Sequence, residues 1–411
     1  MSGQGGGAAM DGPIRVLMCG SDIRRVKGGM VTVVQNYLRY TGWEKARHTY
    51  LVTHTEGSRV RKILCFAGAW PRAALGLLLG RYDLVHLHVA ERGSFYRKAL
   101  LVRLCRRLRV PVILHHHGAE FEDFYGKMNP KQKAYVRKIF EAADCNLVLS
   151  EFLRGQLLEK APAARVAVLR NAVDAPAERK YRPEARRIVM LGRQGWRKGS
   201  FDLLEAAAAI DGQLPEDVRL WMCGDGDVEE VRRRAEQLGI SRRLAHAGWL
   251  DGEEKESCLA QAMVHVLPSY REGLPMSILE TMARGIPNVS TAIASIPEVI
   301  RDGETGFLME PGDVARLSEL LLRLAGDGEL RERLSREGYR LIAEDFSLEK
   351  HIAGLETIYE RLITNALGGS PAGADALCPE KEKAAAYRAD LHPADTGVGA
   401  HCGEHVAKPP F

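Results

Sequence analysis

Two carboxylates stand in the segment REGLPMSILETMARG, Glu272 in a predicted loop and Glu280 in the helix that follows it. A carboxylate has two acceptor oxygens and can bridge a vicinal diol such as a ribose, whereas the free amides of a helix start suit a diphosphate. We therefore expect Glu280 to be held toward the strand edge where a ribose would bind, and Glu272 to be free to face a sugar. The spacing alone is equally compatible with a solvated helix residue and an ordinary loop charge.

The predicted helix begins near Pro275, and its 3.6-residue period divides the following side chains into two faces. One face is apolar and is expected to pack on the core: Ile278, Leu279, Met282 and Ala283. The other face is expected to be polar: Ser277, Glu280, Thr281 and Arg284.

Arg193 and Lys198 lie in LGRQGWRKGS, where a predicted strand ends and a glycine-flanked loop leads into a helix. Arginine grips phosphate oxygens with a bidentate fork and lysine adds a point charge, so the two would stabilise charge on a departing diphosphate. Loop Arg and Lys residues are more often solvated surface. The position directly after a strand favours the phosphate interpretation.

Two further segments offer weaker signals. Gly28 and Gly29 precede a helix expected to begin near Met30, and glycines let backbone amides approach a phosphate closely, although the pair is also ordinary turn chemistry. In HHHGAEF the alternation of a strand points His115 and His117 to one face and His116 to the other. Zinc is not expected there, because adjacent ligands on opposite faces do not converge. His117 is expected either to bond a sugar hydroxyl or reacting oxygen, or to be a satisfied core histidine.

The sequence Asp225-Gly226-Asp227 resembles the acidic pairs that hold a divalent metal against a diphosphate. In GDGDVEEVRRRAEQL, however, Asp227 suits a helix N-cap, and Glu230 three residues later would complete a capping box. Helix initiation thus explains the acids without a metal. The incomplete glycine pattern at Gly224 also makes a dinucleotide site a poor interpretation.

These residues follow short apolar runs that alternate with amphipathic helical stretches, which predicts parallel sheets covered by helices. The first set of strands is IRVLMCG, HTYLVTH, DLVHLHV, VPVILHH, CNLVLS and VAVLRN, and the second is RIVMLG, RLWMCG, LAHAG, VHVLPS, IPNVST and TGFLME. Ligands of open parallel sheets bind outside the carboxyl ends of the strands. Both sets place their polar loops there, which predicts two Rossmann-like α/β domains facing one cleft.

The polar, proline-containing stretch between the two sets is expected to separate the domains. We expect a flexible leader at residues 1–13, a first Rossmann-like, acceptor-side domain at 14–178 and a second, donor-binding one at 186–345. A C-terminal helix at 346–364 should pack back toward the first domain. Residues 365–411 are small, polar and unpatterned, and are expected to be disordered.

Composition narrows the class of protein. With 411 residues, 45% apolar and 27% charged, the chain suits two ordinary globular domains, and a net charge of +5 gives no argument for nucleic acid. Its eight cysteines form neither a metal pair nor a disulfide framework and are expected to be free thiols. No signal sequence or membrane-spanning run is evident, so we expect a cytoplasmic protein.

Between about Ile14 and Ile363 the sequence resembles glycosyltransferase family 4, whose members are retaining, metal-independent enzymes of the GT-B fold. The resemblance rests on GR with a following KG, on PSYREGLPMSILETMARGIP and on PEVIRDGETGFL, in the family's order and spacing. It departs from the family where Ala294-Ser295 replaces Gly-Gly, Thr281 replaces alanine and Asn288 replaces valine. These departures concern the donor pocket and leave the class unchanged.

The resemblance implies roles for individual residues. Arg193 and Lys198 would neutralise the donor diphosphate, Glu280 would bind the ribose and Glu272 the donor sugar. The backbone amides of Gly273, Leu274, Pro275 and Met276 lie in the matching stretch, of which Pro275 has no amide hydrogen to offer. Gly28 and Gly29 match the phosphate loop, His117 an active-site histidine, and Asn171 an asparagine near the interdomain hinge. The family mechanism is front-face substitution, in which the leaving phosphate helps to deprotonate the acceptor and neither a protein nucleophile, a metal nor another cofactor is required.

The expected partners are a nucleotide-sugar donor and a glycan or lipid-linked acceptor, as in bacterial relatives that build surface polysaccharides. A basic and partly apolar segment is equally compatible with peripheral contact with anionic lipid on the inner face of the cell membrane and with a solvated helix face that packs its apolar side into the domain. It comprises Arg92, Arg97, Lys98, Arg103, Arg106, Arg107 and Arg109 beside Phe95, Tyr96 and Leu100, with WPRAALGLLLG upstream.

Three alternatives remain open at this point. The same contacts would serve a nucleotide-sugar epimerase or hydrolase, which has no sugar acceptor. They would also serve a non-catalytic protein that binds the nucleotide sugar. A metal-dependent transferase would use Asp225 and Asp227.

Overall fold

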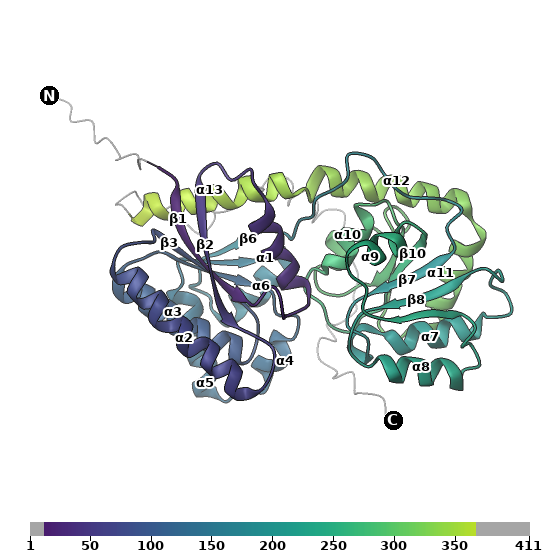
Figure 1. Ribbon diagram of the computed structural model, residues 1–411, viewed down its shortest axis with the longest axis horizontal. Helices are drawn as coiled ribbons and strands as arrows, with labels where there is room; N and C mark the ends of the chain where they lie inside the picture. Colours follow the sequence, from purple (N-terminus) through teal and green to yellow (C-terminus); the bar gives the residue numbers. More distant parts are fainter. Residues whose placement is uncertain (1–11, 367–411) are drawn as a thin grey trace, which may run out of the picture. The chain divides into compact units, whose positions relative to one another are not determined.

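The computed structural model describes residues 12–366, which belong to one compact unit and contain two parallel six-stranded sheets (Figure 1). Every predicted run of strand residues forms a strand, because each is a short β-branched or apolar stretch with helices on both faces of its sheet. The predicted α/β fold is therefore confirmed. Most of the predicted leader and tail lies outside the described residues.

The first sheet has the strand order β2-β1-β3-β4-β5-β6. Its strands are β1 (Ile14–Ser21), β2 (Ala46–His54), β3 (Leu84–Val89), β4 (Val112–His116), β5 (Cys145–Val148) and β6 (Val166–Val168). The helices between them are α1 (Gly29–Arg39), α2 (Arg59–Leu78), α3 (Gly93–Leu108), α4 (Phe121–Gly126), α5 (Pro130–Ala142) and α6 (Glu151–Lys160). One face of the sheet packs on α2, α3 and α5, and the opposite face on α1.

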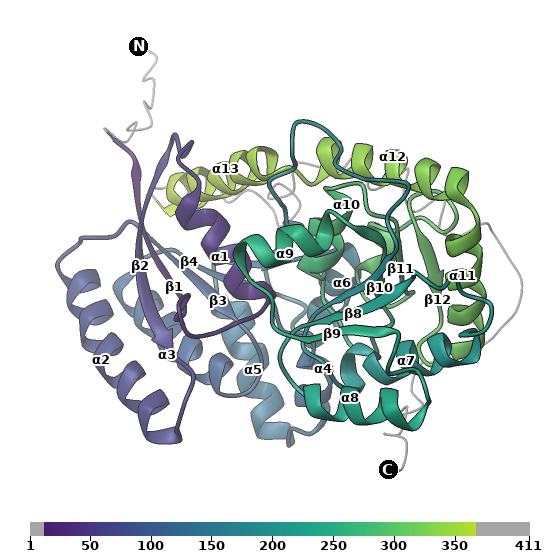
Figure 2. The ribbon, with the colours of Figure 1, turned by 45° about the vertical axis from the view of Figure 1, so that its right-hand side comes forward.

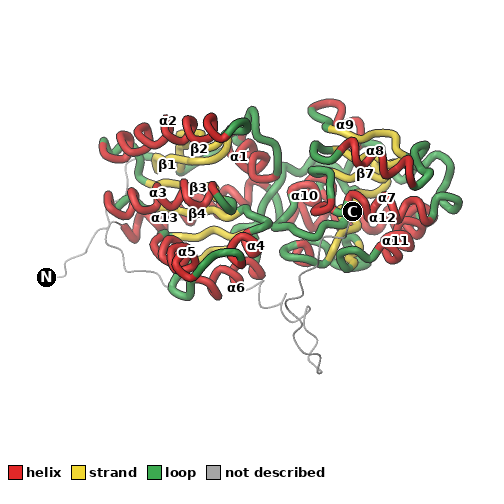
Figure 3. Tube along the Cα trace, turned by 90° about the horizontal axis from the view of Figure 1, so that it is seen from below, coloured by secondary structure: helices red, strands yellow, loops and turns green. Residues whose placement is uncertain are grey.

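The second sheet has the order β12-β11-β10-β7-β8-β9. Its strands are β7 (Arg187–Leu191), β8 (Arg219–Cys223), β9 (Leu244–Gly248), β10 (Ala262–Leu267), β11 (Asn288–Thr291) and β12 (Phe307–Met309). Its helices are η1 (Trp196–Lys198), α7 (Ser200–Ala209), α8 (Val228–Gln237), α9 (Gly252–Leu259), α10 (Met276–Met282), η2 (Ile296–Glu298), α11 (Val314–Gly326) and α12 (Gly328–Asp345). Helices enclose the strands of both sheets (Figure 3).

The last helix, α13 (Leu348–Ala366), returns to the first sheet and lies beside α1 (Figures 1 and 2). Just before it, Ser347 forms a parallel bridge with Val173. Within it, the Glu356 carboxylate accepts hydrogen bonds from the amides of Lys45 and Ala46, at 2.7 and 3.1 Å. No helix among residues 12–366 combines the length and apolar character needed to span a bilayer.

Candidate functional site

A pocket of about 370 Å³ lies at the carboxyl ends of the strands, lined by loops that follow β1, β4, β5 and β6 of the first sheet and β7 to β10 of the second. The strand-end rule therefore holds in both sheets. All of the residues predicted to bind or react line this pocket: Gly28, Gly29, His117, Arg193, Lys198, Glu272, Gly273, Leu274, Pro275, Met276 and Glu280.

Lys198 and Glu272 form a close ion pair within the pocket, with side chains only 12% and 5% exposed. The Ser269 hydroxyl donates a second hydrogen bond to the Glu272 carboxylate, at 2.7 Å. The sequence predicted that Glu272 would be free to face a sugar. In the structure two neighbours anchor it, since a buried carboxylate needs hydrogen-bond partners. Burial lowers the pKa of Lys198, and the adjacent Glu272 opposes that shift.

Arg193 presents a more exposed cation: its side chain is 67% exposed, and its Nη1 lies 3.5 Å from a carboxylate oxygen of Asp225. Asp227 occupies the N-cap of α8 but makes no side-chain cap hydrogen bond, and Glu230 pairs with Arg233 instead. The predicted capping box is therefore wrong. Asp225, the first aspartate of the pair, is accounted for by its contact with Arg193.

Glu280 lies in α10, with its side chain 18% exposed and one oxygen 2.6 Å from Nζ of Lys255 on α9. Lys255 also lines the pocket, and nothing in its segment GEEKESCL distinguishes it from a solvated helix. Thr281, predicted on the polar face, is fully buried. It tolerates burial because its hydroxyl bonds the Ser277 carbonyl oxygen at 2.7 Å, which satisfies the donor inside the helix.

The glycine loop of the first sheet faces the start of α10. Gly28 is the N-cap of α1 with φ 132°, a conformation that favours glycine. A Cβ atom at Gly29 would lie 3.6 Å from Cγ of Met276. Beside this loop, Nζ of Lys27 lies 3.8 Å from the centre of the Trp249 ring, and both residues line the pocket although neither was predicted.

His117 reaches the pocket from the end of β4, and its Nε2 lies 2.9 Å from Nδ1 of His88. Burial lowers the pKa of His117 to about 3, so the ring is neutral at physiological pH. Its neighbour Asn171 donates from Nδ2 to the Leu274 carbonyl oxygen at 2.9 Å, and so connects the first half of the chain to the loop before α10.

The predicted alternation of the three histidines is confirmed. The rings of His115 and His117 lie 4.2 Å apart on one face, and His116 bonds Asn146 at 3.0 Å on the other. Zinc was not expected here because only His115, His116 and His117 were taken as potential ligands. The neighbouring strand β3 places His86 and His88 beside His115, so imidazoles do converge on this face.

Two other contacts connect the halves of the chain near the pocket. The hydroxyls of Ser150 and Ser295 lie 2.7 Å apart, and Glu298 accepts from the amide of Glu151 at 3.1 Å. Ala294, next to Ser295, has φ 49°. This left-handed conformation favours glycine, so it accounts for the glycine usual at this position and makes Ala294 a strained departure from it.

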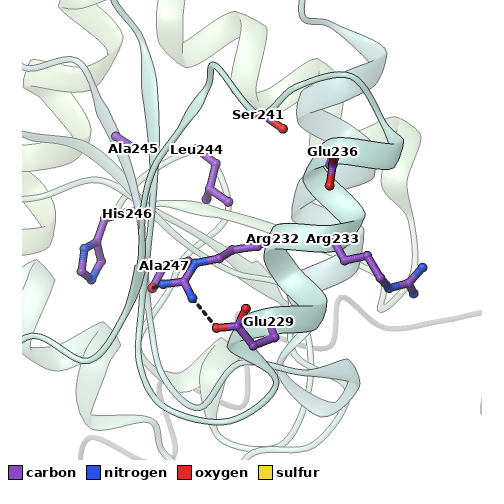
Figure 4. A pocket seen from close by; sticks show the side chains of 9 residues that line it. All are labelled: Glu229, Arg232, Arg233, Glu236, Ser241, Leu244, Ala245, His246 and Ala247. Atoms are coloured by element: carbon purple, nitrogen blue, oxygen red, sulfur yellow. Dashed lines mark hydrogen bonds and ion pairs between the residues drawn. The ribbon is translucent and has the colours of Figure 1, made fainter.

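A second hollow lies between α8 and β9, away from all of these residues (Figure 4). Its two arginines are paired: Arg232 pairs with Glu229 and donates to the Ala247 carbonyl oxygen at 2.7 Å, and Arg233 pairs with Glu230. Because its arginines are already paired, this hollow has less claim to bind an anionic ligand than the pocket at the strand ends.

Comparison with known proteins gives consistent matches. The model for Glycosyltransferase Family 4 matches residues 28–175, and that for Glycosyl transferases group 1 matches residues 175–341. The Bacillus subtilis putative glycosyltransferase EpsD is 30% identical over 68% of this chain and 76% of its own length. The Rhizobium meliloti lipopolysaccharide core biosynthesis glycosyltransferase LpsE is 35% identical over 45% of this chain, and the match spans only 51% of that relative.

Solved structures share the fold at low sequence identity. Sucrose-phosphate synthase from Thermosynechococcus elongatus has a TM-score of 0.69 at 19% identity, over 86% of this chain and 100% of the other. Anabaena HepE, solved in complex with UDP, has a TM-score of 0.67 at 14% identity, over 85% of this chain and 99% of the other.

Proposed function

The chain belongs to glycosyltransferase family 4 and has the GT-B fold, and on that premise we propose that it moves a sugar from a nucleoside-diphosphate sugar to an acceptor hydroxyl, with retention of configuration and without a metal ion. The observation that carries the proposal is the composition of the pocket. Five cationic side chains, three carboxylates, a neutral histidine and the start of a helix meet at one place, and Arg193, Lys198, Glu272 and Glu280 are among them. The UDP bound in the HepE structure supports the choice of donor.

In the proposed reaction the bond from the anomeric carbon to the diphosphate oxygen breaks, and the bond to the acceptor oxygen forms on the same face of the sugar. The acceptor proton passes to an oxygen of the leaving phosphate. Arg193 and Lys198 stabilise the charge that develops on this group. Glu272 orients the sugar hydroxyls, Glu280 holds the ribose, and His117 donates or accepts a hydrogen bond as a neutral ring.

We further propose a glycan or lipid-linked acceptor in polysaccharide or glycolipid assembly. The names of LpsE and of the phosphatidyl-myo-inositol mannosyltransferase of Mycobacterium leprae, 27% identical over 70% of this chain, support this choice. Such acceptors lie at membranes. A transferase that acts on them from the cytoplasmic side needs a surface that meets the inner face of the cell membrane.

The surface of α2 has the composition that such a contact requires. Its outward side exposes Val60, Ile63, Leu64, Leu75 and Leu78, each more than half exposed. Residues 59–81 contain no acidic residue, and their charges are Arg59, Arg61, Lys62, Arg72 and Arg81. Apolar side chains flanked only by cations suit insertion among anionic headgroups.

The structure changes part of the surface predicted from α3, which lies beside α2 (Figures 1 and 2). Phe95 and Lys98 are buried, with Lys98 donating to the Thr53 hydroxyl at 2.7 Å, so neither can meet lipid. Arg103, Arg107 and Arg109 remain exposed and extend the cationic surface. The proposed membrane contact is therefore centred on α2.

Flotation with vesicles tests this contact. The chain should float with vesicles that contain anionic lipid and not with neutral ones, and Ile63→Asp with Leu64→Asp should abolish flotation. Phe152→Asp, at a half-exposed apolar site on α6, is the control and should leave flotation unchanged. Equal flotation of the α2 variant would refute the contact.

Transfer itself is tested by incubating the chain with labelled nucleotide sugars and lipid or glycan acceptor pools in the presence of a chelator. We expect a labelled glycoside whose anomeric configuration matches that of the donor, and its loss in Glu272→Gln with nucleotide binding retained. Nucleotide release without a glycoside would indicate a hydrolase or an epimerase. Binding without turnover in the wild type would indicate a non-catalytic protein, and activity restored only by metal would implicate Asp225.

A further inference from the structure

Three imidazoles of the first sheet converge on the face covered by α1 and α13. His86 and His88 alternate on β3, and His88 lies opposite His115 on β4. One ring nitrogen from each residue lies within 4.8 Å of the other two. All three side chains are fully buried, and none of them lines the strand-end pocket. We call them the histidine cluster.

In His86 and His88, the Nδ1 atom of the ring has a hydrogen-bond partner outside the cluster. Nδ1 of His86 lies 2.6 Å from the Tyr359 hydroxyl on α13, and Nδ1 of His88 lies 2.9 Å from Nε2 of His117. Histidines that ligate metals usually engage the other ring nitrogen in this way, because the contact sets the tautomer and orients the ring. The arrangement is thus already that of a pre-oriented ligand pair.

Two ring nitrogens of the cluster lack a partner in the described part of the chain. Nε2 of His88 and Nε2 of His115 have no hydrogen-bond partner among the described residues. A buried polar nitrogen without a partner costs free energy, which a bound ion would recover at Nε2 of His88. Nε2 of His86 is in hydrogen-bond contact with Nδ1 of His115, 3.1 Å away, and an ion that binds both nitrogens would replace this bond. Two nitrogens on one zinc ion, each about 2.0–2.1 Å from it, are separated by a comparable distance in tetrahedral geometry.

We propose that His86, His88 and His115 bind a late first-row divalent cation of the Zn²⁺ type, with the remaining coordination position taken by water or hydroxide. Imidazole suits zinc, copper and nickel, and a group without a carboxylate does not suit Mg²⁺ or Ca²⁺. The ion would tie β3 to β4 and, through Tyr359 and His117, connect α13 with a residue of the pocket. It takes no part in the bonds of sugar transfer, so this proposal stands apart from a metal-independent donor site.

The test uses the full, untagged chain loaded with Zn²⁺, freed of excess ion by gel filtration and analysed for metal. Wild type should keep one ion per chain and gain thermal stability as Zn²⁺ is added. His115→Gln should lose both properties. His116→Gln is the matched control, since this partly buried neighbour lies on the opposite face and the variant should retain the ion.

Other potential ligands are separated by two further measurements. His401, Cys402 and His405 lie outside the described residues, and a variant with all three changed to serine should still keep the ion. Substitution with Co²⁺ should give the visible absorption of nitrogen-ligated cobalt without a thiolate charge-transfer band, which requires no variant to fold. Failure of wild type to retain Zn²⁺, equal retention by His115→Gln, or loss in the serine variant would overturn the proposal.

Discussion

Lys198 lies against Glu272 at the centre of the pocket, and the pair shows how single side chains set the chemistry there. The lysine is nearly removed from solvent yet remains beside a carboxylate that favours its charged form. A diphosphate would add further negative charge to the same cation. The amine therefore has to stay protonated for the donor to bind. The pH dependence of donor binding consequently measures the protonation of Lys198.

Donor binding should weaken in alkaline solution before an ordinary lysine titrates. Burial lowers the pKa of Lys198 below 10.5, so the amine loses its proton, and with it its attraction for diphosphate, at a lower pH. Between the folded pKa and 10.5 the unfolded chain binds the extra proton, so this group's contribution to stability rises with pH. The pH profiles of kcat/KM and Tm should thus move in opposite directions.

The Lys198→Gln variant provides the control for that profile. It should lose both the alkaline decrease in kcat/KM and the matching rise in Tm, because both effects come from deprotonation of the Lys198 amine. An unchanged alkaline limb in the variant would assign the titration to another group.

Replacement of Glu280 should affect donor affinity more than turnover. Glu280→Gln keeps the shape of the side chain but removes a charged acceptor for the ribose and leaves Lys255 without its partner. We expect the donor KM to rise about 10- to 100-fold, the value of a hydrogen bond to a charged group. Glu256→Gln, which breaks the nearby surface pair with Arg284, should leave the KM unchanged, and a similar rise there would contradict the assignment.

The residues themselves were predictable where their place depends on a strand end, as for Arg193 and Glu280. Lys255 was not, because its role arises from contact with α10 and leaves no trace in its own helix. His86 and His88 were not either, since the register of β3 against β4 decides which imidazoles meet. The departures at Thr281 and Asn288 also become intelligible, because the Thr281 hydroxyl lies 3.1 Å from the Asn288 side-chain oxygen.

At the scale of elements, the ends of neighbouring strands shape the pocket through close backbone contacts. Gly224 follows β8 and Gly192 follows β7, and the two loops carry Asp225 and Arg193 into the pocket. A Cβ atom at Gly224 would lie 1.8 Å from the Gly192 carbonyl oxygen, far inside contact distance. Glycine is therefore required here by space, although its φ is ordinary.

Gly224→Ala should destabilise the second sheet and displace Arg193. The β7 and β8 loops would have to separate, at a cost of at least about 1–3 kcal/mol for an overpacked interior site. Denaturant unfolding measures the loss. Gly212→Ala, where a Cβ atom meets nothing within 4 Å, should leave stability nearly unchanged, and equal effects of the two variants would argue against this steric account.

Strands were the most predictable elements, because fully buried parallel strands such as β3 and β10 are apolar runs interrupted only by histidine. Helix details were less so. The capping box predicted at Asp227 does not form, because the Glu230 carboxylate accepts a hydrogen bond from Arg233 on the same helix. The sequence motif does not reveal this competing partner. The prediction that Thr281 lies on a polar face of α10 was wrong, because its hydroxyl donates a hydrogen bond within the helix and the side chain can therefore be buried.

At the scale of the molecule, two sheets of the same architecture bring their strand-end loops to one pocket, and the family assignment follows from matches that together run from residue 28 to 341. The sequence predicted this arrangement because two rounds of strand and helix are separated by a polar bridge. It did not predict the contacts Asn171–Leu274 and Ser150–Ser295, which join residues more than 100 positions apart. Such pairs depend on how the halves dock and not on local pattern.

The central claim, that this pocket binds a nucleoside diphosphate through Arg193 and Lys198, is tested most directly by thermal shift. Uridine, guanosine and adenosine diphosphates would be titrated in the presence of a chelator against wild type, Lys198→Gln and Arg242→Gln, the last a control at a surface pair with Asp211. At least one nucleotide should raise the Tm of wild type and of Arg242→Gln progressively with concentration. Lys198→Gln should show little or no shift. No stabilisation by any nucleotide, or an equal shift in Lys198→Gln, would contradict the account.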